Sequence, residues 1–205
     1  VFNPQMNTFS SYTSQNGKLP TNNITTLFNT KDNKILIGTA EGLLILNLST
    51  TEIRHLTGNS TNLKTFTNNY ITQVFEDSRG LIWIGTREGI NVLNIEKDDL
   101  SYITEKQGLC NNNICGITED KRRNIWVTTS NGISRIVVQR NTDDGTFGYG
   151  LYNYDVSDGL LSNEFNPGAI MANEDGDVQL GYSNNLSRPK FAIMNPRRTM
   201  TLPPY

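Results

Sequence analysis

Short apolar runs alternate with polar turns along most of this chain. The stretch LIWIGTREGINVLN at 81–94 contains an apolar run, a charged turn, a glycine and a second apolar run. Two related stretches are ILIGTAEGLLILN at 35–47 and IWVTTSNGISRI at 125–136. Short runs rich in Ile, Val, Leu and Trp, separated by polar turns, predict antiparallel β-strands. Because no helical period is found between them, we predict an all-β fold.

The strand-ending triplets repeat at nearly constant spacing. Gly38 and Gly85 are 47 residues apart, and Thr128 follows Gly85 by 43 residues. The same two spacings separate the upstream isoleucines Ile24, Ile71 and Ile114. Two independent landmarks therefore define one repeat. Periods of about 40 to 50 residues with several short strands per unit are typical of β-propeller blades, each a four-stranded antiparallel sheet.

About four blades are predicted within residues 1–191. The units in chain order are the last strand of a preceding blade (1–20), three blades (21–60, 61–107 and 108–160), a partial closing blade (161–191) and an atypical tail (192–205). Because propellers usually close with about 4 to 8 blades, we expect a partial or truncated propeller.

The composition of the chain argues against several classes of binding partner and against a disulfide-rich fold. The chain has 18 Lys and Arg against 20 Asp and Glu, and this balance argues against nucleic-acid binding. No apolar run approaches the roughly 20 residues of a membrane span, so we expect membrane attachment only through flanking segments. Two cysteines are too few for a disulfide framework. Cys110 and Cys115 either form a short local bridge or stay free, with Cys115 packed in a strand; we favour the second alternative.

One family resembles these units in its motifs. The stretches NNYITQVFEDSRGLIWIGTREGINVLN and GLLSNEFNPGAIMANEDGDVQLG, together with the two degenerate copies of the first, are similar to the regulator-propeller repeats of hybrid two-component sensors. The resemblance covers roughly residues 2–181. It implies a periplasmic sensor domain, whose relatives carry a membrane helix and a histidine kinase outside this segment. It also implies oligosaccharide ligands.

Three functions remain open at this point. The first is a noncatalytic ligand-sensing module for oligosaccharides, and the second is a scaffold for protein interaction or self-association. The third is a propeller lyase or glycosidase. We find no nucleophile elbow, metal-ligand cluster or paired carboxylates, and His55 is the single histidine. We therefore predict no catalytic residues, metal or cofactor in this segment.

Four residues are weak candidates for ligand binding: Tyr70, Arg87, Glu88 and Asn112. The pair at 87–88 stands where the other repeats have Ala-Glu and Ser-Asn, and departures from a repeat inside a loop are where specificity tends to lie. The tyrosine replaces an asparagine of the neighbouring repeats. The asparagine belongs to a polar connector whose members either line a ligand mouth or simply form turns, and we favour turns for any single one.

Two further residue pairs have predicted structural roles. Trp83 and Trp126 occupy equivalent strand positions, so we expect them to pack between blades rather than to stack on sugars. Asp77 and Asp120 precede tight turns, where we expect their side chains to accept hydrogen bonds from backbone amides.

Overall fold

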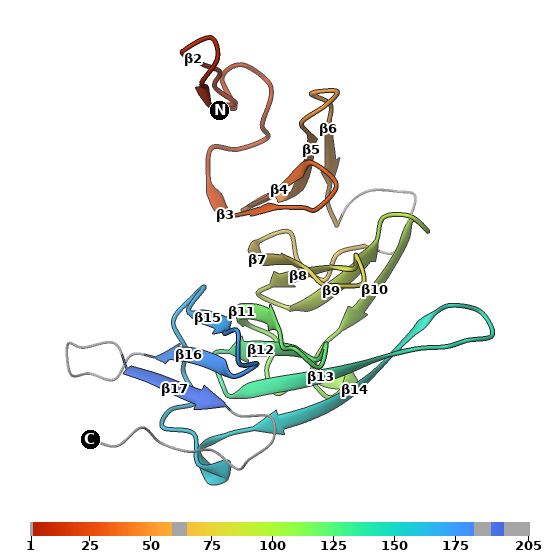
Figure 1. Ribbon diagram of the computed structural model, residues 1–205, viewed down its shortest axis with the longest axis vertical. Coiled ribbons are helices and arrows are strands. Elements are labelled where there is room, and N and C mark those ends of the chain that lie inside the picture. Colours follow the sequence, from red (N-terminus) through yellow and green to blue (C-terminus); the bar gives the residue numbers. More distant parts are fainter. Residues whose placement is uncertain (1, 59–64, 183–189, 195–205) are drawn as a thin grey trace.

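The computed structural model describes residues 2–58, 65–182 and 190–194 (Figure 1). The first two strands, β1 (Phe2–Asn3) and β2 (Thr8–Phe9), pair only with each other. The predicted role of residues 1–20, as the last strand of a preceding blade, stays a prediction. The predicted tail lies outside the described residues apart from 192–194.

Every other strand belongs to one of four antiparallel sheets, which we number blades 1 to 4 in chain order. Blade 1 contains β3 (Ile24–Asn29), β4 (Lys34–Thr39), β5 (Gly42–Asn47) and β6 (Ile53–Leu56). Blade 2 contains β7 (Ile71–Glu76), β8 (Ile82–Thr86), β9 (Gly89–Asn94) and β10 (Asp99–Ile103). Blade 3 contains β11 (Ile114–Glu119), β12 (Ile125–Thr129), β13 (Ile133–Arg140) and β14 (Phe147–Tyr154). The described part of blade 4 contains β15 (Ile170–Ala172), β16 (Val178–Tyr182) and β17 (Lys190–Met194).

The blades follow one another along an arc, with the first strand of each blade on the inner side (Figure 1). Neighbouring first strands contact each other from β3 through β7 and β11 to β15. The only helical segments among the described residues are two single 3₁₀ turns, η1 (Glu105–Gln107) and η2 (Val156–Asp158). The predicted all-β fold, built from antiparallel propeller blades, is confirmed.

Three of the four hydrophobic clusters among the described residues lie between blades. One cluster joins blades 1 and 2 and includes Leu36, Ile45, Ile71 and Ile84. A second joins blades 2 and 3 around Trp83, and a third joins blades 3 and 4 around Trp126. Both indole rings are at most 1% exposed. The prediction that these tryptophans pack between blades is confirmed.

Close approach of blade 1 to blade 2, and of blade 2 to blade 3, requires glycine on the second strand. A Cβ atom added to Gly85 would lie 2.7 Å from Cγ2 of Ile114, the first residue of the next blade's inner strand. The equivalent Gly38 would meet Cγ2 of Ile71 at 2.9 Å. The repeated glycine therefore sets how near one blade comes to the next.

The two aspartates cap the turn between the first two strands of their blades. Asp77 Oδ1 accepts hydrogen bonds from the backbone amides of Arg79 (2.8 Å) and Leu81 (3.0 Å). Its Oδ2 accepts from Trp83 Nε1 at 3.1 Å. The carboxylate of Asp120 makes the same three kinds of bond in blade 3, with Arg122, Asn124 and Trp126 as donors. The predicted capping role is confirmed, and the same carboxylate also satisfies the buried indole N–H.

Both cysteines are free. Cys115 is 7% exposed within β11, and this burial raises the pKa of its thiol. Cys110 is half-buried in the connector before blade 3, with Sγ 3.4 Å from Thr129 Oγ1. The favoured interpretation, a packed Cys115 and an unbridged Cys110, is confirmed.

Candidate ligand-binding site

The turn between the second and third strands has the same backbone in blades 1 to 3. In blade 2, Thr86 Oγ1 donates a hydrogen bond to the carbonyl of Gly89 (2.8 Å) and accepts one from the amide of Glu88 (3.0 Å). Gly89 has a φ of 117°, a conformation that L-residues with a side chain rarely adopt. Because backbone and threonine hold the turn, the side chains of Arg87 and Glu88 are exposed and not needed to form it.

Two of the four predicted site residues contact each other. The guanidinium carbon of Arg87 lies 3.8 Å from the centroid of the Tyr70 ring, a stacked cation–π contact. The backbone amide of Tyr70 donates to Asn68 Oδ1 at 2.7 Å, which forms a local turn just before β7. Tyr70 is half-buried and Arg87 is exposed, so the pair forms an amphipathic platform at the surface of blade 2.

Asn112 lies beside the turn that carries Arg87 and Glu88. Its backbone carbonyl accepts a hydrogen bond of 2.7 Å from the amide of Gly89, which ties the connector before blade 3 to blade 2. Its side-chain Oδ1 accepts from the amide of Glu105 at 2.8 Å. The amide NH₂ is therefore the part of Asn112 that is suited to face a ligand. All four candidates gather at the same end of blades 2 and 3.

The hydrogen bond that Asn112 Oδ1 accepts from a backbone amide has an equivalent in each of the other described connectors. The side-chain oxygens of Asn22, Asn69 and Asn163 accept from the amides of Ser14 (2.8 Å), Gly58 (2.5 Å) and Val156 (2.9 Å), respectively. The preference for turn-forming asparagines is thus confirmed for these residues. A structural role for the Asn112 oxygen does not decide whether its NH₂ binds ligand, which remains a prediction.

The chemistry of this cluster suits a polar, ring-shaped ligand. The Tyr70 ring offers a flat apolar face, Arg87 and the amide of Asn112 offer donors, and the Glu88 carboxylate offers acceptors. Hydroxyl-rich molecules need such a mixture of donors and acceptors beside an apolar surface. The arginine covers one face of the ring, so a ligand would use the open face or displace the guanidinium.

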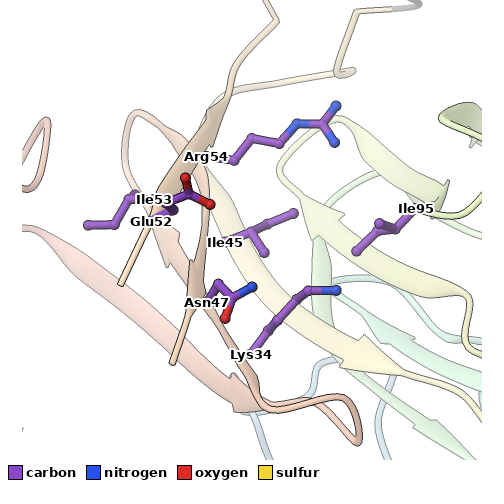
Figure 2. Close-up of a pocket in the computed structure, with 7 residues that line it drawn as sticks. All are labelled: Lys34, Ile45, Asn47, Glu52, Ile53, Arg54 and Ile95. Carbon is purple, nitrogen blue, oxygen red and sulfur yellow. The ribbon is translucent and has the colours of Figure 1, made fainter. Parts of the chain in front are cut away.

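Sequence reasoning missed a groove between blades 1 and 2. Its volume is about 530 Å³, and it is lined by Lys34, Ile45, Asn47, Glu52, Ile53, Arg54 and Ile95 (Figure 2). Lys34 begins β4 and Asn47 ends β5, so the groove lies at the opposite end of the strands from Tyr70 and Arg87. The only sequence signal for it is the short connection at 95–98, compared with the long connection at 141–146 in the next blade.

Residues 2–58, 65–182 and 190–194 contain no group of three His, Cys, Asp or Glu side chains placed to hold a metal ion. Within the same ranges, no helix has the length and apolar character required to cross a membrane.

Comparison with known proteins identifies the repeats. The family model described as two component regulator propeller matches residues 65–88 and 108–131. These two segments contain Tyr70, Arg87, Glu88 and Asn112. No curated protein matches the chain.

A solved structure shows a similar fold. The extracellular domain of the putative hybrid two component system BT3049 from B. thetaiotaomicron is 19% identical, with a TM-score of 0.57. The match covers 95% of this chain and 30% of that one, so this chain spans less than a third of its neighbour's length. The extracellular domain of the putative hybrid system BT4673 from the same organism is 20% identical, with a TM-score of 0.34, and the match covers 98% of this chain and 39% of that one.

Proposed function

We propose that this chain, which carries two-component regulator propeller repeats, is a noncatalytic ligand-sensing segment of an extracytoplasmic receptor of a two-component system. One observation carries the proposal: the matched repeats at 65–88 and 108–131 are the segments that supply the exposed Tyr70–Arg87 platform and its neighbour Asn112. The extracellular location of the domain of similar fold in BT3049 supports placing this segment in the periplasm.

Oligosaccharides are the ligand class that we propose. The ring of Tyr70 provides a surface for the apolar face of a pyranose, and Arg87, Glu88 and Asn112 provide hydrogen-bonding groups around it. Within the part of the chain that the structure describes, no group of three His, Cys, Asp or Glu side chains placed to hold a metal ion accompanies the platform. Binding without turnover fits this set of residues.

The proposed mechanism couples ligand binding to the arrangement of paired receptor chains. A ligand in contact with both the 86–89 turn of blade 2 and the connector at 109–113 would favour the conformation in which these segments are correctly spaced. A ligand shifts an equilibrium only by its difference in affinity for the two states. Self-association of receptor chains would pass this bias to a kinase beyond the segment.

Calorimetric titration of the complete extracytoplasmic domain with a panel of glycan fragments tests this function. We expect at least one fragment to bind, and Tyr70→Ala and Arg87→Ala each to weaken binding by about tenfold or more, as expected when a stacking or charged contact is lost. Tyr102→Ala is a matched control, because Tyr102 is a 51% exposed tyrosine of β10 in the same blade. Binding of no fragment, or equal losses in Tyr70→Ala and Tyr102→Ala, would overturn the proposal.

A further inference from the structure

The groove between blades 1 and 2 has the volume of a small-molecule site. Its volume of about 530 Å³ falls within the range of roughly 300 to 1,000 Å³ that is usual for ligand pockets. Ile45 is 6% exposed and faces the half-buried Ile95 of blade 2 across the groove. Figure 2 shows Arg54 and Lys34 extending from blade 1 toward Ile95, on either side of Ile45. An apolar interior is therefore flanked by two cations, and the Glu52 carboxylate also lines the groove.

The repeat shows what fills the equivalent space one blade further along. In blade 3, the last pairs of the β13–β14 hairpin before its turn include Val138 with Tyr149. The Tyr149 ring packs edge-to-face on Trp83 of blade 2, with a centroid distance of 5.7 Å. Its hydroxyl lies 3.2 Å from Ser101 Oγ, and burial raises the pKa of this phenol. An aromatic ring with one polar oxygen thus occupies the groove between blades 2 and 3.

Strand register identifies the residues that replace this arrangement between blades 1 and 2. Asn94 pairs with Asp99 as Val137 pairs with Gly150, so Asp98 takes the place of Tyr149. The spacing of 47 residues places Arg54 where blade 2 has Ser101. Arg54 Nη2 and Asp98 Oδ1 form an ion pair of 2.8 Å.

A polar contact therefore crosses each of the two grooves: Tyr149 with Ser101 in one, and Asp98 with Arg54 in the other. Of these two grooves, only the one between blades 2 and 3 is also filled by an aromatic ring. The difference comes from hairpin length. Strands β13 and β14 have eight residues each and bring Phe147 and Tyr149 over blade 2, whereas β9 ends at Asn94 and the chain turns back within 95–98. The space that the two aromatic rings occupy in one groove remains as a hollow in the other.

We propose that the groove between blades 1 and 2 binds a small aromatic carboxylate. The ring lies between Ile45 and Ile95, as Tyr149 lies against blade 2. The carboxylate accepts hydrogen bonds from Arg54, and Lys34 adds a second positive charge. This site is separate from the platform at Tyr70 and Arg87, and the inference does not depend on the proposed sensing of oligosaccharides.

Arg54 can engage such a ligand because its present partner is weakly held. Arg54 and Asp98 are 48% and 52% exposed, so solvent screens their attraction. A guanidinium has five N–H donors, and the bond to Asp98 uses one of its nitrogens. Lys34 Nζ, which pairs with Asp32, also has three donors. A ligand carboxylate can therefore join or replace Asp98 without exposing a buried charge.

Titration of the 205-residue chain with 4-hydroxybenzoate, followed by the methyl resonances of its isoleucines, tests the proposal. We expect saturable shifts centred on Ile45 and Ile95. p-Cresol, which has the ring without the carboxylate, should bind more weakly, and acetate should produce no saturable shift. Shifts confined to other methyl groups, absence of saturation at millimolar concentrations, or equal binding of p-cresol would overturn the proposal.

A variant that carries the blade 2 residue at an equivalent position of the groove provides the second measurement. Arg54→Ser reproduces Ser101 and should weaken 4-hydroxybenzoate binding about tenfold or more, because a charge-assisted hydrogen bond is lost. Arg140→Ser is the matched control, with the same change in charge at an exposed position of β13. Equal affinity of these two variants would contradict the proposal. If Arg54→Ser does not fold, the methyl shifts and the p-cresol comparison on the unmodified chain decide the outcome.

Discussion

At the scale of single residues, Asp77 and Asp120 connect the turn of a blade to its core. Each carboxylate accepts from two backbone amides of the turn and from one indole N–H. Asp77 is completely buried and Asp120 is 4% exposed. A buried carboxylate needs such partners, because leaving it or its donors unsatisfied costs more than an average hydrogen bond contributes.

Replacement of Asp77 by Ala should therefore destabilise the chain strongly. The change leaves two turn amides and the buried Trp83 N–H without their acceptor, so we expect a loss of about 2–4 kcal/mol in the free energy of unfolding. Urea denaturation followed by tryptophan fluorescence measures this loss. Asp143→Ala, at an exposed turn, should change the free energy by less than about 0.5 kcal/mol. Similar losses in the two variants would contradict the role assigned to Asp77.

Some residue roles could be predicted from the sequence, and others could not. The capping aspartates and the interblade tryptophans repeat in register, so their roles followed from the pattern. The stacking of Arg87 on Tyr70 did not, because two residues 17 positions apart meet only once the sheet has formed and rotamers are chosen. Phe66 was also missed: it is buried in the connector where other blades have Leu19, Leu109 and Leu160.

At the scale of elements, successive blades are joined at two levels. On the second strand, glycine lets an isoleucine of the next blade's inner strand approach closely, as Gly85 does for Ile114. At the strand ends, Glu119 of blade 3 accepts hydrogen bonds of 2.7 Å from the amide and hydroxyl of Ser78 in blade 2. Glu76 likewise accepts from the amide of Lys31 at 3.0 Å. The blades are thus fixed to each other by both apolar and polar contacts.

Gly85→Ala should disturb this packing. The added methyl group would lie 2.7 Å from Ile114 Cγ2, so one blade must shift, and we expect a loss of about 1–3 kcal/mol in unfolding free energy. In Gly148→Ala, by contrast, the new Cβ meets no atom within 4 Å in strand β14. That control should be neutral or stabilising by about 0.5–1 kcal/mol, because alanine restricts the unfolded chain. Thermal or urea unfolding of both variants makes the comparison, and the reverse order of stability would count against close blade contact at Gly85.

The groove was not predicted from the sequence because its formation depends on where the hairpins end. The pattern of apolar runs predicted strands but not where each hairpin ends. The contrast between the short β9–β10 connection and the long β13–β14 hairpin decides whether aromatic rings cover the preceding blade. Such a contrast becomes visible only when the strand pairs are placed in register.

At the scale of the whole molecule, the arc of blades presents two chemically different ends. The connector end carries the Tyr70–Arg87 platform and Asn112, within the repeats that match the regulator-propeller family. The opposite end carries the groove flanked by Lys34 and Arg54. The same strands run from one end to the other, and the cores between the blades pack these strands together. An arc of blades built in this way presents two separate surfaces on one scaffold.

The central functional claim is that ligand binds at the connector end of blades 2 and 3. A crystal structure of the complete extracytoplasmic domain with its tightest-binding glycan fragment tests it most directly. We predict a sugar ring against Tyr70, with polar contacts to Arg87 and to the side-chain NH₂ of Asn112. A fragment bound elsewhere, with Arg87 still stacked on Tyr70 and no sugar within hydrogen-bonding distance of Asn112, would contradict the account.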